Sequence, residues 1–405
     1  MDTPGQPCVL LKHGEVFLKG RNRHRFTERL HDNLRVALRG VEGSTWIKPV
    51  QSVTVLGGDA PVEELVERAR RVIGFTHVEP AIRIPSTLDE ITHHAIAALR
   101  RLESESDRDE VRSFAVRTRR RDKRFPLNSS GVDRYVGARI KDALPQLTVS
   151  LKRPDVRLSI AVDRGETHLS WRRLPGLTGL PVGSSGRALV LLSGGYDSPV
   201  AAHHAMRRGL ACDFVHFSGA PYANPSSVYK AYALARELNR YQPPGRLQVI
   251  ALGKAQRQLS VAGAGRLQVV AQRRLMVRTA SVLAARDGGE ALVTGDSLGQ
   301  VASQTLANLA AVDEAAALPV LRPLIGWDKQ EIIDEARTIG TAGISVLPDE
   351  DCCQLLAPPR VSLRARLPEL AAVEKRLDLD ELVAALLEHT QVMTPGAEET
   401  AGEPA

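Results

Sequence analysis

The feature that most constrains this chain is an apolar run that breaks into a glycine turn and then a helix. Residues 188–199 read Ala-Leu-Val-Leu-Leu-Ser-Gly-Gly-Tyr-Asp-Ser-Pro, and a helix-like segment follows from Val200. This order predicts a buried strand, a tight turn and a helix N-terminus. Such a turn directs backbone N–H groups and the positive end of the helix towards an anion, typically a phosphate.

The turn offers several candidate contacts to a nucleotide. Gly194 and Gly195 permit close approach of the backbone, and Ser193 and Ser198 add hydroxyl groups. The turn lacks the GxxxxGK[ST] pattern of a Walker-type P-loop. Its SGGxDS pattern resembles the PP-loop of ATP pyrophosphatases, which release pyrophosphate and transfer AMP to a substrate. The simpler alternative is an ordinary glycine-rich turn without a ligand.

Length and composition predict a soluble, multidomain protein. A chain of 405 residues holds two or three domains, and 43% hydrophobic and 25% charged residues are typical of globular proteins. No apolar run reaches the roughly 18 residues of a membrane span, and the N-terminus lacks a signal-peptide pattern. We therefore expect a cytoplasmic protein with no membrane partner. Its four cysteines include no CxxC pair, so a disulfide framework or a zinc site is not expected.

The charge pattern favours a polyanionic partner. The net charge is +7, and residues 117–126 read Arg-Thr-Arg-Arg-Arg-Asp-Lys-Arg-Phe-Pro directly after a predicted strand. We expect this run to contact RNA phosphates, with Phe125 alongside, although such runs are often only a solvated face. The candidate RNA-binding residues are Arg117, Arg119, Arg120, Arg121, Lys123 and Arg124.

Periodicity divides the chain into three folded regions and a tail. Residues 1–75 and 76–173 are each expected to form an α+β domain, and residues 174–186 form a Pro/Gly-rich linker. Residues 174–390 alternate between strands and helices, which predicts a doubly wound parallel sheet. Residues 391–405 are expected to be a disordered tail. The predicted strands of the third domain are 188–192, 211–217, 247–252, 291–294 and 319–321.

A second polar cluster follows another short strand. Residues 293–304 again place Gly, Asp and Ser after apolar residues, so they can form a second wall of a nucleotide site. Gly295 permits close approach, Asp296 is a candidate Mg²⁺ ligand and Gln304 offers an amide. Arg273 or Arg274, on a predicted basic helix, could neutralise a triphosphate. Each residue has a plain structural alternative as a loop, cap or helix-face residue.

The cysteines suggest different roles. Cys352 and Cys353 lie in a polar, Pro-bounded loop after three acidic residues, and adjacency disfavours a disulfide between them. The acids tend to raise thiol pKa values, yet the setting favours a catalytic thiol over packing. Cys212 lies within an apolar strand and is predicted to be a core residue.

Taken together, these clusters resemble the tRNA 4-thiouridine synthetase family, the bacterial tRNA sulfurtransferases. The resemblance covers about residues 9–390. It implies an N-terminal ferredoxin-like domain (1–75), a THUMP RNA-binding domain (76–173) and a PP-loop adenylating domain (174–390). The matching segments are residues 14–23, 191–200, 216–217, 221–222, 294–309, 321–326 and 350–353.

The resemblance also implies site residues, cofactors and partners. Asp197 would serve the pyrophosphate and Mg²⁺, and Cys352 would carry the sulfur. ATP would adenylate O4 of tRNA uridine 8, and a persulfide would displace AMP to give 4-thiouridine; some relatives also supply sulfur for the thiamine thiazole. We expect ATP and Mg²⁺ as cofactors and a homodimer. The implied ATP contacts are Leu191, Leu192, Ser193, Gly194, Gly195, Ser198, His216, Phe217, Arg273, Gly295 and Gln304.

The chain departs from the family pattern in two ways. Long relatives add a rhodanese-like domain, for which this chain is too short, so a separate cysteine desulfurase is the expected sulfur donor. The thiol that resolves the Cys352 disulfide is then unassigned, with Cys353 the nearest candidate. Bulky Tyr196 fills the variable position of the PP-loop. Alternative functions are another PP-loop ligase and a non-catalytic RNA-binding protein that responds to ATP.

Overall fold

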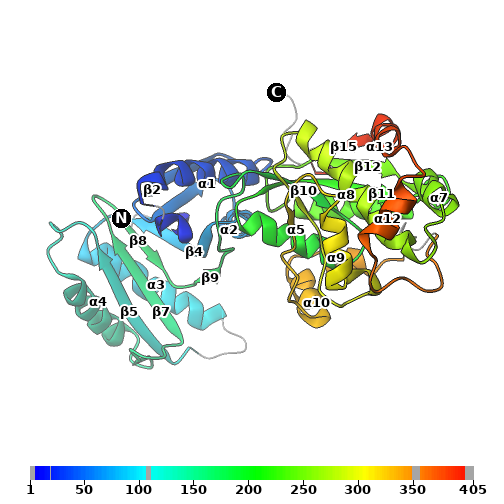
Figure 1. Ribbon diagram of the computed structural model, residues 1–405. Coiled ribbons are helices and arrows are strands. Elements are labelled where there is room, and N and C mark those ends of the chain that lie inside the picture. The colour runs from blue at the N-terminus through cyan, green and yellow to red at the C-terminus, as the bar shows by residue number, and fades with distance from the viewer. Residues whose placement is uncertain (1–4, 19, 106–110, 349–355, 397–405) are drawn as a thin grey trace. The chain divides into compact units, whose positions relative to one another are not determined.

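A computed structural model describes residues 5–18, 20–105, 111–348 and 356–396. The chain divides into two compact units (Figure 1). Unit one comprises residues 1–18 and 41–178, and unit two comprises residues 19–40 and 179–405. Helix α1 (Arg23–Ala37), which the sequence places in the N-terminal domain, thus groups with unit two. There its Asn33 side chain donates a hydrogen bond to the carbonyl of Val182 (3.1 Å).

Unit one is built on a single nine-stranded sheet with the order β2-β3-β1-β4-β8-β7-β5-β6, and β9 pairs with β4. Its helices are α2 (Val62–Arg70), α3 (Leu88–Glu105) and α4 (Ser129–Ala143). Its strands are β1 (Gln6–His13), β2 (Thr45–Val50), β3 (Val53–Gly58), β4 (Phe75–Ile84), β5 (Ser113–Arg120), β6 (Thr148–Val149), β7 (Val156–Val162), β8 (Thr167–Ser170) and β9 (Leu174–Pro175).

Strand β4 joins the two small domains expected in this unit. The predicted boundary between residues 75 and 76 falls at the start of β4, a strand that the sequence analysis missed. One edge of β4 pairs with β1 and the other with β8, both antiparallel. The ferredoxin-like and THUMP regions therefore share one continuous sheet.

Unit two contains the predicted doubly wound sheet, in the order β14-β13-β10-β11-β12-β15. Neighbours among the first five strands are parallel, and β15 is antiparallel to β12. Each predicted strand is confirmed to within one residue at either end. The strands are β10 (Arg187–Leu191), β11 (Ala211–Ser218), β12 (Leu247–Ala251), β13 (Ala291–Val293), β14 (Val320–Leu321) and β15 (Gln391–Met393).

The expected tail begins too early. Residues 391–393 form β15, whose Val392 pairs with Gln248 of β12, so the prediction of disorder is wrong for these residues. Because β12 would otherwise be an edge strand, β15 satisfies its outer backbone groups. Residues 397–405 lie outside the described residues.

The helices of unit two surround this sheet (Figure 1). Helix α8 packs against β10 and β13, with Val270, Leu275 and Leu283 almost fully buried. Besides α1, the helices are α5 (Asp197–Arg207), α6 (Ser226–Leu238), α7 (Gly253–Val261), α8 (Gln268–Arg286), α9 (Leu306–Asp313), α10 (Lys329–Thr338), α11 (Ala342–Ser345), α12 (Leu367–Glu374) and α13 (Leu379–Glu388).

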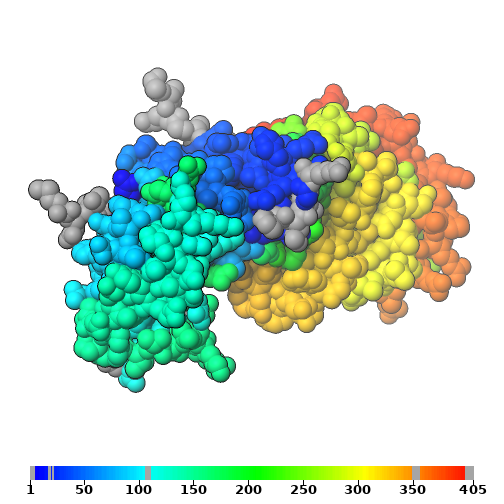
Figure 2. Space-filling model, turned by 90° about the vertical axis from the view of Figure 1, so that its left-hand side faces the viewer, coloured from blue at the N-terminus to red at the C-terminus, as the bar shows by residue number. Residues whose placement is uncertain are grey.

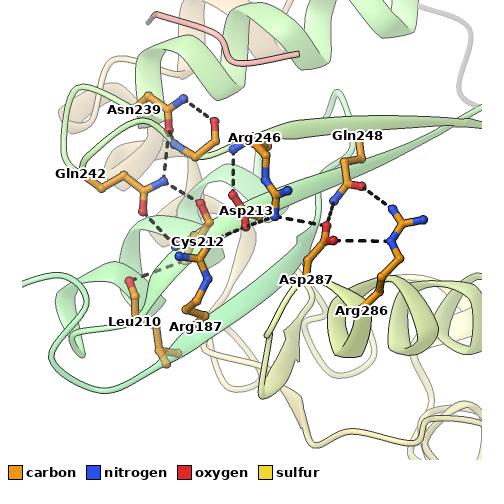
Figure 3. A network of polar contacts seen from close by, with 11 residues as sticks. Arg187, Leu210, Cys212, Asp213, Asn239, Gln242, Arg246, Gln248, Arg286 and Asp287 are labelled. Carbon is orange, nitrogen blue, oxygen red and sulfur yellow. Dashed lines mark hydrogen bonds and ion pairs between the residues drawn. The ribbon is translucent and has the colours of Figure 1, made fainter. Parts of the chain in front are cut away.

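A polar network braces the amino-terminal edge of this sheet, where β10, β11 and β12 begin (Figure 3). Asp213 accepts hydrogen bonds from Arg187 (2.7 Å) and Arg246 (3.3 Å). Beside them, the Gln242 amide bonds both backbone groups of Cys212. Cys212 is 2% exposed, as predicted for a core residue, and burial raises the pKa of its thiol. Ligands of such sheets bind at the opposite, carboxyl edge, so this network is structural.

Candidate functional site

The glycine turn after β10 is closed by its own serines. Ser198 lies in the first turn of α5 and is 3% exposed. Its Oγ accepts a hydrogen bond from the Ser193 backbone N–H (2.9 Å) and lies 3.1 Å from Ser193 Oγ. The turn is therefore held in shape before any ligand binds, which is the preorganisation that an anion-binding loop requires.

The residues that flank this turn are held by hydrogen bonds and by packing in the core. Leu192 is 2% exposed, and its N–H donates to the carbonyl of Val215 (2.8 Å). Its carbonyl lies 2.9 Å from Nδ1 of His216, whose Nε2 lies 3.1 Å from Ser227 Oγ. Phe217 is 3% exposed and belongs to the core, against which Leu191 also packs. The buried side chains of Leu192, His216 and Phe217 therefore hold the carboxyl edge of the sheet in place.

Gly295 brings the second loop into contact with the turn. A Cβ atom at this position would lie 2.5 Å from the backbone nitrogen of Ser198 and 2.7 Å from the carbonyl carbon of Asp197. Real Cβ atoms do not approach backbone so closely, so the two loops would have to separate. Glycine at 295 is thus required by the packing of β13 and its loop against the start of α5.

A matched pair of glycine substitutions tests this contact. Gly295→Ala is expected to lower the free energy of unfolding of unit two by about 1–3 kcal/mol, the usual cost of overpacking. Gly195→Ala should leave it unchanged, because a Cβ there would meet only Ser193 Oγ, at 3.6 Å. Urea unfolding of both variants measures the difference. Equal stability of the two variants would contradict the packing argument.

Asp296 is the centre of a buried charge cluster. Its Oδ1 accepts from Arg273 (2.6 Å) and Gln304 (3.2 Å), and its Oδ2 accepts from Thr294 (2.8 Å) and Arg322 (3.2 Å). Burial by itself would raise the pKa of this carboxyl, but Arg273, Thr294 and Arg322 together lower it. Both oxygens are therefore engaged by donors. This donor set does not fit the Mg²⁺ role expected for Asp296, so that expectation is corrected.

The same cluster distinguishes the two candidate arginines of α8. Arg273 reaches the carboxyl edge of the sheet, where it contacts Asp296 and the carbonyl of Ser303 (3.2 Å). Arg274 points elsewhere and is 3% exposed, bound to Glu374 and Glu314. Only Arg273 is thus placed to meet a polyphosphate at this edge.

Asp197 has two partners that the sequence analysis did not identify. Lys329 Nζ lies 2.9 Å from its Oδ1, and Gln300 Nε2 donates to its Oδ2 at 3.0 Å. Lys329 is the first residue of α10, and its Nζ lies 5.5 Å from the ring centre of Tyr196. A lysine at the start of α10 carries no local sequence signal of a partner in a distant turn.

A histidine–glutamate brace joins α5 to α10. Glu335 Oε1 lies 3.4 Å from Nδ1 of His203 and 3.7 Å from Nε2 of His204. The proximity of His203 lowers the pKa of Glu335. Burial lowers the pKa of His204, whose ring contacts Trp327 edge-on. The brace fixes α10, and with it Lys329, relative to the glycine turn.

These shifts predict acid sensitivity of unit two. A depressed folded-state pKa means that the unfolded chain binds protons at a higher pH than the folded chain does. Unfolding free energy should therefore fall as the pH drops below the usual pKa of His204, near 6.5, and fall further below that of Glu335, near 4.5. His204→Phe keeps an aromatic ring and should reduce the first step in urea titrations between pH 7 and 5, while His31, whose pKa burial also lowers, supplies the rest. An unchanged pH profile would contradict this assignment.

The segment that carries Cys352 and Cys353, residues 349–355, lies outside the described residues. The residues on either side of it are held at the site. Ser345 Oγ donates to the carbonyl of Gly195 (3.1 Å), and Lys230 Nζ donates to that of Leu347 (2.5 Å). On the other side, Asn308 Nδ2 donates to the carbonyl of Ser362 (2.8 Å). Before this segment, the chain contacts the glycine turn through Ser345. After it, Ser362 contacts Asn308 of α9, the helix that follows the second loop.

The basic run in unit one divides into exposed and internal side chains. Arg117, Arg119, Lys123 and Arg124 are exposed. Arg124 forms an ion pair with its neighbour Asp122 (3.0 Å), a contact that RNA phosphates could replace. These four residues are compatible with the predicted contact to a polyanion.

The other members of the run support the fold. Arg121 is 10% exposed at its side chain and forms a 2.8 Å ion pair with Asp163. Arg120 donates to the carbonyls of Phe125 and Leu127, both at 3.3 Å. Phe125 is 7% exposed and packs in the core of the THUMP region. The Phe125 ring of this run therefore belongs to the core, and Arg120 and Arg121 are occupied within the protein.

Two features are absent from the part of the chain that the structure describes. None of its helices combines the length and apolar character needed to cross a membrane. The described residues also contain no group of three or more His, Cys, Asp or Glu side chains arranged to hold a metal ion.

Family models match all three regions of the chain. The model described as "Thiamine biosynthesis protein (ThiI)" matches residues 183–379, the THUMP domain matches residues 85–172, and the ThiI ferredoxin-like domain matches residues 8–78. These matches support the mixed α/β architecture, in which a PP-loop sheet follows two α+β regions.

Curated relatives match over nearly the whole chain. A probable tRNA sulfurtransferase of Nocardia farcinica is 55% identical, covering 96% of this chain and 94% of its own. Its counterpart from Thermus thermophilus is 42% identical, covering 94% and 92%. That of Bacillus subtilis is 35% identical, covering 98% and 97%.

A solved structure agrees with these relatives. The crystal structure of a 4-thiouridine synthetase–RNA complex with bound ATP superimposes with a TM-score of 0.87 at 28% identity, covering 96% of this chain and 100% of that one. The PH1313 protein of Pyrococcus horikoshii shares the fold, with a TM-score of 0.64 at 22% identity, covering 83% and 100%. The order of domains, the glycine turn and the identity to curated relatives lead to one conclusion: this chain belongs to the tRNA sulfurtransferase family, the 4-thiouridine synthetases.

Proposed function

We propose that this chain uses ATP to adenylate O4 of uridine 8 in tRNA and then replaces that oxygen with sulfur, giving 4-thiouridine. The observation that carries the proposal is the contact between the glycine turn and the second loop. Gly295 packs on Ser198, and Asp296 holds Arg273 at the same edge of the sheet. The related 4-thiouridine synthetase was crystallised with RNA and ATP, which supports the same ligands for this chain.

ATP would lie across the turn. The backbone of Ser193, Gly194 and Gly195 and the start of α5 at Ser198 suit its phosphates. The main chain at 191–192 and 216–217 would border the nucleoside. Arg273 would approach the phosphates, and Gln304 still has an unpaired amide oxygen among the described residues. A Cβ at Gly195 would contact only the hydroxyl of Ser193, at 3.6 Å, which leaves room for a ligand beside the turn.

Mg²⁺, when bound, would neutralise the phosphates and stabilise the departing pyrophosphate. Asp197 is the carboxylate best placed to serve it, because it lies at the turn and is partly exposed at 21%. Asp296 is occupied by two arginines and is not proposed as a ligand. Lys329, bound to Asp197, adds positive charge at the same place.

The proposed first step activates a poor leaving group. O4 of the uracil attacks the α-phosphorus of ATP, an O–P bond forms, and the bond to the β-phosphate oxygen breaks to release pyrophosphate. The N3 proton leaves, so the product is a neutral O4-adenylated base. Arg273 and Lys329 would stabilise the negative charge that develops on the phosphates.

The proposed second step transfers sulfur. The terminal sulfur of a Cys352 persulfide attacks C4 of the base, and AMP leaves with the original oxygen. A second thiol must then break the sulfur–sulfur bond, which forms a disulfide with Cys352 and leaves the sulfur on the base. A cysteine desulfurase is the proposed source of the persulfide. A homodimer and a role in thiamine thiazole synthesis also remain part of the proposal.

Nucleoside analysis tests the proposal directly. Transfer RNA from a strain that lacks the gene is expected to contain no 4-thiouridine, and the wild-type gene should restore it. An unaltered 4-thiouridine content would refute the proposed function. Purified protein that binds ATP and tRNA but never releases pyrophosphate would instead favour a non-catalytic, ATP-responsive RNA-binding role.

The exposed basic residues should set the salt dependence of tRNA binding. The triple variant Arg119→Ala/Lys123→Ala/Arg124→Ala is expected to bind tRNA more weakly. The slope of log K against log[salt] should fall by about 0.7–0.9 for each phosphate that these side chains no longer neutralise. Filter binding at several salt concentrations gives this slope. The control Arg121→Ala removes the internal partner of Asp163, so it should lower stability while leaving the slope unchanged.

A further inference from the structure

An irregular segment of unit two carries three exposed arginines and no acidic residue. Residues 356–368 read Leu-Ala-Pro-Pro-Arg-Val-Ser-Leu-Arg-Ala-Arg-Leu-Pro and lead into α12. Arg360, Arg364 and Arg366 are exposed, and none of them has an ion-pair partner among the described residues. We call residues 360–366 the arginine loop. The orange part of the chain, which contains this loop, reaches the surface on the right of Figure 2.

Buried polar groups hold the backbone of the arginine loop in place. Asn308 is 0% exposed; its Nδ2 donates to the carbonyl of Ser362 (2.8 Å), and its Oδ1 accepts from the Ala365 N–H (2.8 Å). Thr305 Oγ1 donates to the carbonyl of Leu363 (2.7 Å). A loop that is already held in this way loses little further backbone entropy when it binds a ligand.

The same contacts tie the arginine loop to the proposed nucleotide site. Thr305 directly follows Gln304, a proposed ATP contact that donates to Asp296 (3.2 Å). Asn308 Nδ2 also donates to the carbonyl of Ala302 (2.9 Å), on the other side of Gln304 in the sequence. The end of the second loop and the arginine loop therefore form one hydrogen-bonded unit.

On the basis of the proposed function, we infer that the arginine loop binds the RNA backbone beside the target uridine. O4 of this base must reach the α-phosphorus of ATP, so the phosphates on either side of the nucleotide must lie at the rim of the nucleotide site. An unpaired guanidinium at that rim can bind a phosphate through two N–H donors. Such a contact positions the uridine for the reaction and reads no sequence.

RNA fits this surface better than a protein partner does. Interfaces with nucleic acids are much more positively charged than interfaces between proteins, and residues 356–368 carry three positive side chains and no negative one. Guanidinium planes also stack on bases that have left the RNA stack. Leu363, which is 64% exposed, offers an apolar contact to a ribose or a base.

The salt dependence of tRNA binding tests the arginine loop. The variant Arg360→Ala/Arg364→Ala/Arg366→Ala should bind tRNA more weakly, and the slope of log K against log[salt] should fall by about 1 for each phosphate contact that is lost. Its ATP affinity and its unfolding in urea should match the wild type, because all three side chains are exposed. The control Arg240→Ala/Arg337→Ala removes two other exposed arginines of unit two and should keep the wild-type slope. A wild-type slope in the triple variant would overturn the inference.

A chemically modified RNA tests where the contact lies. Methylphosphonate linkages, which are uncharged, would replace the phosphates on both sides of the target uridine in a synthetic tRNA. Wild-type protein should bind this RNA at least about fivefold more weakly than the unmodified RNA, the effect of losing one hydrogen bond to a charged group. The triple variant should bind the two RNAs alike. Equal weakening in the wild type and the variant would show that the loop does not contact these phosphates.

Two outcomes separate this inference from its rival and from the function on which it rests. The triple variant could keep wild-type tRNA binding and thiolate with cysteine persulfide, a small donor, but not with a cysteine desulfurase. The loop would then dock the sulfur-donating protein, and the inference would be wrong. If wild-type protein binds RNA through the loop but forms no 4-thiouridine with either donor, the inference stands and the proposed function fails.

Discussion

Cys352→Ser protein is expected to form no detectable 4-thiouridine, a loss of at least about a thousandfold, while it still releases pyrophosphate from ATP when tRNA is present. A serine hydroxyl cannot carry a persulfide, so only the second of the two proposed steps is lost. The measurement pairs nucleoside analysis with pyrophosphate release in the same reaction. Retention of the first step would show that the variant folds and binds both substrates.

The described residues give a physical reason for this expectation. Ser345 and Leu347 are anchored to Gly195 and Lys230, seven and five residues before Cys352. Ser362, on the far side of the segment, is anchored to Asn308. Both described ends of the segment are therefore held by residues of unit two.

Cys212→Ala is the matched control. Its thiol is buried in β11 and its pKa is raised by burial, so it is not a nucleophile. This variant should form 4-thiouridine at the wild-type rate. Substantial thiolation by Cys352→Ser, or a loss of thiolation by Cys212→Ala at unchanged stability, would contradict the assignment of Cys352 as the sulfur carrier.

Local pattern was sufficient to predict the frame of the site. The apolar strand, glycine turn and helix of residues 188–207 are formed by neighbouring residues, and so is the second loop after β13. Periodicity predicted the strands of the parallel sheet because apolar residues dominate each of them, although Asp213 and His216 interrupt β11 and Gln248 interrupts β12. Strand β4 was missed, since Thr76, His77, Glu79 and Pro80 interrupt its apolar residues and Pro80 argues against a strand.

Long-range partners were beyond prediction from one sequence. Lys329 lies 132 residues from Asp197, and Ser345 lies 150 residues from Gly195. Nothing in the local sequence of either side chain specifies such a partner. Asp296 was misjudged for the same reason: its two arginines come from α8 and from the end of β14. Sequence reasoning thus identified the residues that shape the two loops. It did not identify the basic side chains that form ion pairs with the loop carboxylates Asp197 and Asp296.

Arg274→Ala is expected to lower the free energy of unfolding of unit two by about 3–5 kcal/mol, the cost of breaking a buried ion pair. Arg274 is 3% exposed, and its guanidinium binds both oxygens of Glu374, at 2.5 and 3.0 Å. Removing Arg274 would leave the Glu374 carboxylate, whose side chain is 10% exposed, largely without a compensating positive charge. The contact also joins α8 to α12, so the loss should loosen the packing between them.

Urea unfolding, followed for unit two, measures this cost, and Arg278→Ala is the control. Arg278 binds the same carboxylate from the rim, at 3.3 Å and 32% exposed, where an ion pair is worth about 1 kcal/mol or less. The double variant Arg274→Met/Glu374→Leu removes both buried charges and should recover most of the lost stability. Equal losses for Arg274→Ala and Arg278→Ala, or no recovery in the double variant, would show that the penalty does not come from an uncompensated buried charge.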